Sequence, residues 1–401
     1  MPTTFDQYKK PALVLGGGGT KAAAFHAGVC VALQEKGFVF SGGTQKEVKE
    51  TLSLSKNQPV FQTYIGSSAG AIICSFLAKG YSIEDILKAT IDKEDVNFFN
   101  HSWFKKSTEK LPAIKYRDLF SFNLSLDEGK NLLKSFVSFN ALTKTFSLES
   151  LLKAYLPISG ILSPNKIEKY FKNKVGSKNE FKQLGVDLFI LCSKLDELGL
   201  MAFSKYKKKY PEIEYADYGL ISEAIAASTA MPGIFSPYPI TNKKDTQFFY
   251  DGGILEDLAP KIADIQMADI VVMSNPIIPY HYHESKGSLS KHGIPFILTQ
   301  AIYQLIYKQN KTEKDRKAQL HNTFNNLKKY LDSLKLSGEE KDKIFNIIEK
   351  KINFKQNTKY IYIQPEKTDY RLFWSDHISL NKKLLSYAFK KGLKAGMSAL
   401  K

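Results

Sequence analysis

The chain has 401 residues, of which 43% are hydrophobic and 27 are phenylalanine, so it can bury a sizeable core and is not expected to be disordered. Its formal net charge of +17 favours polyanionic partners, either nucleic acid or anionic lipid. We exclude nucleic acid as a partner, because the sequence has no zinc-finger spacing and no aromatic RNA-binding strand.

No apolar run approaches the roughly 20 residues that a membrane span needs, and the N-terminus lacks the apolar stretch of a secretory signal. We therefore expect a cytoplasmic or peripheral membrane protein, while export that needs no such signal stays open. The three cysteines lie in apolar segments without C-x-x-C spacing, which predicts buried side chains and neither disulfides nor metal ligands: Cys30, Cys74 and Cys192.

The first predicted element is an apolar strand at 12–15, which runs directly into four glycines, Thr20 and Lys21, with a helix after them. This order is typical of a backbone site for an anion, either a nucleotide phosphate or a reaction oxyanion. The glycine spacing fits neither the dinucleotide-binding nor the P-loop pattern. We therefore favour an oxyanion loop that Lys21 closes, and we interpret His26 as a packed or partly exposed side chain and not as a catalyst.

The most informative stretch is 59–79. An apolar strand at 60–65 ends in Gly66-Ser67-Ser68-Ala69-Gly70, and an apolar helix without Gly or Pro follows. Strand, G-x-S-x-G and helix form the context of a nucleophile elbow, in which small residues permit a strained turn and the helix start favours an oxyanion. A glycine-rich turn without chemistry shows the same five residues, but the context favours Ser68 as a nucleophile.

The middle of the chain is less regular. Residues 38–59 look like a polar connection, and Ser82 with Asp85 predicts a capped helix start. Aromatic residues and lysines mix from about 96 to 182 without a strand pattern, which indicates a helical cap or insertion. Within it, 97–106 is interpreted either as a membrane-facing segment or as a helical cap over the core.

Strand patterns return at 185–192 and 200–203, and a helix of small residues at 221–230 is followed by an extended segment. A short strand at 248–250 leads into Asp251-Gly252-Gly253. An acid at a strand end can project into a site where glycines turn the backbone away, although Asp-Gly is also an ordinary turn.

The C-terminal part predicts a strand at 269–274, a helical region at about 294–355 with a break near Ser337, a strand at 360–363 and a basic amphipathic helix at 380–400. The alternation of strands and helices predicts an α/β fold with a mostly parallel sheet. Because strand and helix patterns continue to the end, we expect one domain over 1–401.

Four blocks, in the same order as in the family, make the chain similar to the patatin-like phospholipases: Gly17-Gly18-Gly19-Thr20-Lys21, Gly66-Ser67-Ser68-Ala69-Gly70-Ala71, the run from Ala227 to Pro237 that resembles A-S-x-A-x-P-x-x-F-x-P, and Asp251-Gly252-Gly253. The resemblance implies a three-layer α/β/α fold with helical insertions. It also implies an acyl-ester lipid such as a phospholipid as substrate, with phospholipase A-type or lysophospholipase activity and with no metal or organic cofactor.

The resemblance further implies a Ser–Asp dyad, in which Ser68 attacks the acyl carbonyl and Asp251 takes its proton. Backbone amides would hold the oxyanion, and four further residues would support the site: Gly17, Gly18, Gly19 and Ala69 for the amides, and Lys21, Gly66, Gly70 and Gly252 for the support. The sequence departs from the family where Ala22 replaces a glycine after the basic residue. It also departs where Asp257 and Pro260 stand in place of an Asn and an earlier Pro.

Two alternatives remain. A Ser–Asp–His esterase would use one of the histidines after Asp251, namely His281, His283, His292, His321 or His377. We prefer the dyad, because the nucleophile comes early for that fold and none of these histidines follows a strand. The other alternative is a silent scaffold that docks on anionic membranes or binds a partner. The sequence leaves open whether a protein partner activates the chain.

Overall fold

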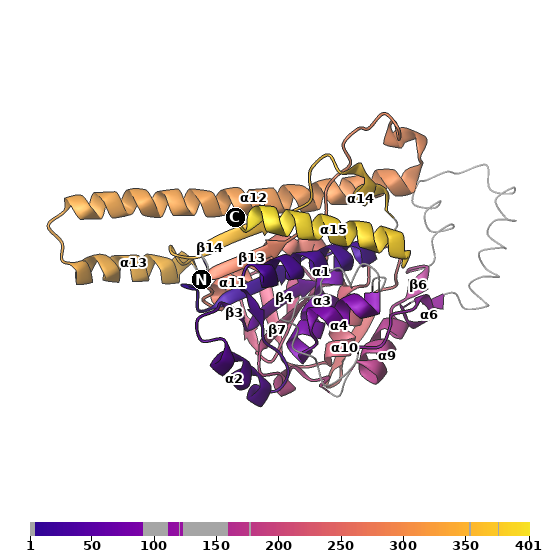
Figure 1. Ribbon diagram of the computed structural model, residues 1–401, viewed down its shortest axis with the longest axis horizontal. Coiled ribbons are helices and arrows are strands. Elements are labelled where there is room, and N and C mark those ends of the chain that lie inside the picture. The colour runs from indigo at the N-terminus through magenta and orange to yellow at the C-terminus, as the bar shows by residue number, and fades with distance from the viewer. Residues whose placement is uncertain are drawn as a thin grey trace, which may run out of the picture.

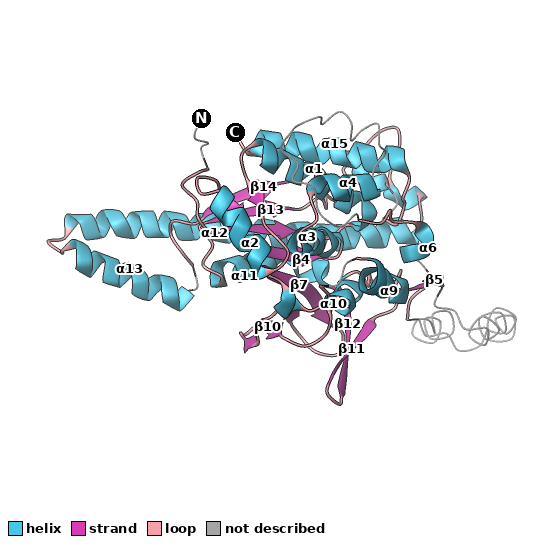
Figure 2. Cartoon of the chain, turned by 60° about the horizontal axis from the view of Figure 1, so that its bottom comes forward, coloured by secondary structure: helices cyan, strands magenta, loops and turns pink. Residues whose placement is uncertain are grey.

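The computed structural model describes residues 5–90, 111–119, 121–122, 159–175, 178–352, 354–375 and 377–401 (Figures 1 and 2). Its centre is a mixed sheet in which most neighbouring strands run parallel. The strands in spatial order are β14 (Lys359–Ile363), β13 (Ile270–Ser274), β1 (Pro11–Leu15), β4 (Thr63–Ser67), β7 (Asp187–Lys194), β8 (Leu200–Phe203), β10 (Ile213–Ala216) and β9 (Lys208–Lys209). The hairpin of β11 (Tyr238–Asn242) and β12 (Asp245–Asp251) joins the sheet at β7.

Helices cover both faces of the sheet because alternate residues of the central strands are apolar on both sides. Leu13 and Leu15 of β1 pack into the cluster that contains α1 (Gly19–Glu35), α3 (Ala69–Lys79) and α15 (Lys382–Ala399). Ala12 and Val14 of the same strand face α11 (Ala259–Ile265) on the opposite side. Strands buried on both faces are typical of α/β proteins. The predicted three-layer α/β/α fold with a mostly parallel sheet is confirmed.

The two ends of the chain meet in one layer, where α15 lies along α1 in both views (Figures 1 and 2). A side chain on Gly28 would place its Cβ 2.1 Å from the Phe389 carbonyl oxygen, and one on Gly392 would lie 2.0 Å from that of Phe25. Glycine is therefore required on both helices for this close approach. The single domain over 1–401 stays a prediction, which this contact supports.

The polar connection predicted over 38–59 is wrong. The segment forms β2 (Val39–Phe40) and α2 (Gln45–Leu54), and β3 (Val60–Phe61) follows it. A capping box between Thr44 and Glu47 begins α2, and Val48 anchors the helix in the core. Thr44-x-x-Glu47 was a visible signal, but the surrounding polar residues concealed it.

The predicted start of α4 (Ile83–Thr90) is confirmed, since the Asp85 amide donates to Ser82 Oγ at 3.1 Å and the Ser82 amide donates to Asp85 Oδ2 at the same distance. Residues 97–106 lie outside the described residues. The described parts of 96–182 contain α6 (Tyr116–Leu119), α9 (Asn165–Lys174), η2 (Phe181–Gln183) and the paired β5 (Ser121–Phe122) and β6 (Leu162–Ser163). The remaining helices are α10 (Ile221–Ser228), η3 (Gly252–Leu258), η4 (Leu289–Lys291) and α14 (Tyr370–Trp374).

Two helices occupy the predicted helical region of 294–355, and they form a hairpin. In Figure 1 the far end of α12 (Ile294–Ser333) and all of α13 (Gly338–Ile352) extend beyond the body of the protein. A buried ion pair between Lys317 of α12 and Asp264 of α11 attaches the hairpin, and the Tyr360 hydroxyl also bonds Asp264. Within the described residues, none of the helices combines the length and the hydrophobicity that crossing a membrane takes.

Candidate active site

Strand β7 brings Ser68 and Asp251 together. On one edge it pairs with β4 as far as Ser67, opposite Leu191, and on the same edge β12 arrives with Asp251 opposite the next residue, Cys192. The other edge of β7 is occupied by β8, which fixes both partners to this side. The end of a parallel strand and the end of an antiparallel strand therefore meet, although they are far apart in the sequence.

Ser68 stands at a sharp turn between β4 and α3. Its backbone has φ 52° and ψ −122°, a conformation that is strained for a residue with a side chain. The turn is tight, since a Cβ on Gly70 would lie 2.0 Å from the Leu15 carbonyl oxygen and one on Gly66 would lie 2.7 Å from Ala71 Cα. The small residues of the G-x-S-x-G pattern are therefore needed for close packing, as a nucleophile elbow requires.

Ser228, at the end of α10, holds this turn. Its Oγ accepts the amide of Ser68 at 2.8 Å and donates to the Leu191 carbonyl oxygen at 2.6 Å. The backbone of the serine is thereby tied to β7 through one buried hydroxyl. No role was predicted for Ser228 itself, although it belongs to the block that begins at Ala227.

Asp251 is buried at the end of β12. Its Oδ1 accepts the Gly253 amide at 2.8 Å, and the Ser68 side chain lies on the same side of Gly17 as this oxygen. Burial raises the pKa of Asp251 from 3.8 to about 6, and the neighbouring Ser68 side chain and the Gly253 amide oppose this rise. A Cβ on Gly252 would lie 2.1 Å from the Leu191 carbonyl oxygen, so the turn after the acid must be glycine.

The glycine loop lies against both side chains. A Cβ on Gly17 would lie 3.2 Å from Ser68 Cβ and 3.8 Å from Asp251 Oδ1. Neighbouring amides are used within the protein: Gly16 donates to Ser274, Gly70 to Gly16, and Thr20 to His377. Among the described residues, no acceptor is recorded for the amides that the sequence assigned to the oxyanion, those of Gly17, Gly18, Gly19 and Ala69.

The Lys21 side chain reaches the end of α14. Its buried ammonium group donates to the carbonyl oxygens of Leu372 at 2.6 Å and Ser375 at 2.9 Å, at the end of α14. The role of Lys21 in closing the oxyanion loop stays a prediction. Its contacts anchor the segment that follows α14, and the His377 carbonyl oxygen of that segment accepts the Thr20 amide at 2.8 Å.

His26 is a packed histidine. Its Nε2 lies 2.8 Å from the Gly16 carbonyl oxygen and its Nδ1 lies 2.9 Å from Ser274 Oγ. A carbonyl can only accept, so Nε2 carries the proton and Nδ1 accepts from the serine. Burial lowers the pKa of His26 from 6.5 to about 4, which leaves the ring neutral. The ring thus steadies Gly16, the residue next to the loop.

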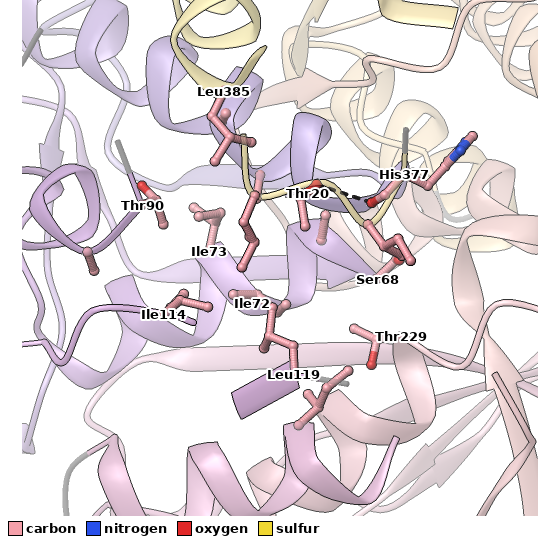
Figure 3. Close-up of a pocket in the computed structure, with 18 of the residues that line it drawn as sticks. Thr20, Ser68, Ile72, Ile73, Thr90, Ile114, Leu119, Thr229, His377 and Leu385 are labelled. Atoms are coloured by element: carbon pink, nitrogen blue, oxygen red, sulfur yellow. Dashed lines mark hydrogen bonds between the residues drawn. The ribbon is translucent and has the colours of Figure 1, made fainter. Parts of the chain in front are cut away.

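The histidines after Asp251 make other contacts. His377 lines the pocket beside Ser68, but its ring bonds the Tyr303 hydroxyl and points away from Ser68 (Figure 3). The ring of His321 faces the carbonyl oxygens of Lys317 and Thr358. Throughout the described part of the chain, no histidine ring has a recorded contact with the Asp251 carboxylate, and no three His, Cys, Asp or Glu side chains gather as a metal site would need.

A pocket of about 580 Å³ opens at Ser68. Figure 3 shows Ser68 and Thr229 on one side of it, and apolar side chains extending away from the serine. The apolar lining includes Ile72, Ile73, Phe76, Ile114, Leu119, Phe171 and Leu385, and Lys88, Lys115 and Lys382 also line the pocket. Its volume and its apolar wall are those of a site for a small, largely apolar ligand.

The family model of the patatin-like phospholipases matches residues 13–264 of the chain. The chain belongs to the patatin-like phospholipase family. The matched range begins in β1, ends in α11 and contains the glycine loop, Ser68 and Asp251. Membership in the family supports hydrolysis of lipid acyl esters in general terms. No curated protein was similar enough to the chain to count as a match.

Proposed function

We propose that this protein is a lipid acyl hydrolase of the phospholipase A or lysophospholipase type, with Ser68 and Asp251 as its catalytic dyad. The observation that supports this most strongly is that the Ser68 side chain and the buried Asp251 carboxylate lie together beside Gly17, at the end of an apolar pocket. Besides the nucleophile, an acyl-transfer site needs hydrogen-bond donors for the oxyanion. The amides beside the hydroxyl that have no acceptor among the described residues supply these donors.

In the proposed reaction the Asp251 carboxylate accepts the proton of the Ser68 hydroxyl while Ser68 Oγ attacks the ester carbonyl. The carbonyl oxygen becomes an oxyanion, which the amides of Gly17–Gly19 and Ala69 stabilise. The C–O bond to the lipid alcohol breaks, and the alcohol leaves with the proton from Asp251. A water molecule, deprotonated by Asp251, then attacks the acyl-enzyme; the bond to Ser68 Oγ breaks, Asp251 returns the proton to this oxygen, and the fatty acid is released.

The environment of Asp251 suits a general base. In water a carboxylate is a weak base for a serine hydroxyl, but burial raises the pKa of Asp251 to about 6 and brings it closer to neutral pH. A carboxyl group whose pKa lies just below the working pH is ionised at that pH, and it is a stronger base than an ionised carboxyl group with a lower pKa. Every step uses side chains and amides of this chain.

The pocket also supports the substrate class. Its apolar wall fits a fatty acyl chain, and Lys88, Lys115 and Lys382 among its lining fit an anionic headgroup such as a phosphate. We therefore propose a phospholipid or another acyl-ester lipid as the substrate, and a peripheral position on an anionic membrane as the place of work.

The test is product analysis of a phospholipid after incubation with the wild type and with Ser68→Ala. We expect fatty acid and lysolipid from the wild type, and a loss of at least about 10³-fold in the variant. Ser67→Ala is the matched control, because the Ser67 hydroxyl is equally buried and has no hydrogen-bond partner among the described residues. Equal turnover by Ser68→Ala would refute the proposal.

Two rival functions give different results in the same assay. A Ser–Asp–His esterase predicts that one histidine variant, such as His377→Ala, abolishes cleavage as completely as Asp251→Ala does. A silent docking scaffold predicts that the wild type cleaves no acyl ester at all, in micelles or in vesicles.

A further inference from the structure

The first turns of α12 carry apolar side chains on two opposite faces. One face is buried, with Tyr303 and Ile306 packed against Phe373. The opposite face is exposed to solvent, with exposed fractions between 39% and 71%. We call this second set the bare apolar face; it consists of Ile294, Ile297, Leu298, Ile302 and Leu305.

These five residues form one continuous stripe. Their spacing of three, four, eight and eleven positions from Ile294 is that of one side of an α-helix. One helix side is enough to bury α12 against the body, so a second apolar side adds nothing to folding. Contiguous apolar surface of this kind on a folded protein marks an interaction site.

The charge around the bare apolar face is of one sign. Between Glu284 and Glu313 the chain has no acidic residue. Four exposed lysines flank the face on both sides: Lys286, Lys291, Lys308 and Lys311. Glu313 itself is buried and bonds Arg316, so it does not offset them at the surface. Aliphatic and basic side chains together on one helical surface are a combination that binds lipid headgroups and upper acyl chains.

The bare apolar face is close to the pocket. Tyr303 lies on the buried side of the same helix turns, and its hydroxyl bonds the ring of His377. His377 and the next residue, Ile378, line the pocket that contains Ser68. One helix therefore separates the exposed stripe from the pocket wall, so a surface bound to the stripe lies near the reacting serine.

We propose that the bare apolar face of α12 inserts into the surface of an anionic lipid bilayer, with the flanking lysines on the phosphates. This inference rests on the proposed function, in that it names the surface by which the enzyme reaches its lipid. An anionic bilayer is the occupant because it offers apolar depth for the stripe and negative charge for all four lysines.

The experiment measures flotation of the protein with vesicles of phosphatidylcholine and phosphatidylserine. It uses Leu298→Glu/Leu305→Glu in a Ser68→Ala background, so that binding is measured without turnover. We expect at least about tenfold weaker binding, since two inserted leucines are replaced by repelled charges. Ile347→Glu is the matched control, because Ile347 is 68% exposed on α13, and it should bind as well as its parent.

A second measurement separates this proposal from the proposed function. With Ser68 intact, the double variant should cleave a monomeric short-chain ester at the wild-type rate and lose only vesicle hydrolysis. Unchanged vesicle binding would overturn the docking proposal, and so would a wild-type dimer that the double substitution dissociates while vesicle binding persists. Normal docking without cleavage of any ester by the wild type would leave the docking surface standing and refute the enzyme.

Discussion

The turn at Ser68 and the bare apolar face of α12 contrast in how they use small and apolar residues. Around Ser68 the backbone is held in place, since Ser228 accepts the Ser68 amide and a methyl group added at Gly66 or Gly70 would collide with main chain. On α12 the side chains of the bare apolar face are exposed to solvent by 39% to 71%. Catalysis requires that the reacting groups are positioned to within a fraction of an ångström. Attachment to a membrane surface requires only apolar and basic side chains on one face of a helix.

The two regions should respond differently to substitution, depending on the substrate that is tested. A change at the Ser68 turn should reduce turnover of monomeric esters and of vesicles by the same factor, because both use the same reacting atoms. A change on α12 should spare the monomeric ester. If both regions affected both substrates equally, the separation between chemistry and attachment would be wrong.

The largest effect is expected at Asp251. Asp251→Asn keeps an acceptor for the Gly253 amide but removes the base, so turnover of either substrate should fall by about 10³-fold or more. Product analysis beside the wild type measures this loss. Turnover within tenfold of the wild type would contradict a role for Asp251 as base.

The same variant should be more stable than the wild type at high pH. The folded-state pKa of Asp251 is raised above its ordinary 3.8, so ionised Asp251 costs stability, and the cost grows as the pH rises from about 4 to about 6. Asparagine removes a cost on the order of 3 kcal/mol at pH 8, and none below about pH 4. Thermal unfolding of both proteins at the two pH values checks the sign.

The next effect concerns the pH dependence of the wild type. Turnover needs ionised Asp251, so kcat/KM should be constant well above pH 6 and fall about tenfold for each pH unit below it. The profile of a monomeric ester isolates this limb from lipid binding. If kcat/KM instead fell only near pH 4, burial would not raise the pKa of this carboxyl group during catalysis.

A smaller effect is expected at Ser228. Ser228→Ala leaves the buried amide of Ser68 without its acceptor, and an unsatisfied buried donor costs about 1–3 kcal/mol. We expect roughly tenfold lower kcat with little change in KM, because the turn that positions Oγ loosens while the pocket stays intact. Ser75→Ala is the matched control, since the Ser75 hydroxyl is buried without a partner in the described chain. Equal kinetics for the two variants would remove Ser228 as a positioning residue.

The sequence determined the local parts of this protein. Backbone strain at Ser68, the glycine needed at 66 and the cap at Ser82 depend on residues adjacent in the chain, so motif and spacing were enough to predict them. The hydrophobic periods of the strands and helices were enough to predict the α/β fold class. The helix α2 was missed because its cap lies within a polar stretch, in which Val48 is the buried residue of the helix.

Only the tertiary structure decided which distant groups meet. The pairing order along β7 brings Asp251 to Ser68, and packing turns the Lys21 ammonium group toward the end of α14 and the His377 ring toward Tyr303. The period of α12 predicted a helix, but which of its two apolar sides stays bare depends on the side that the body covers. Side-chain direction over such separations is set by strand order and packing, which no local run of residues specifies.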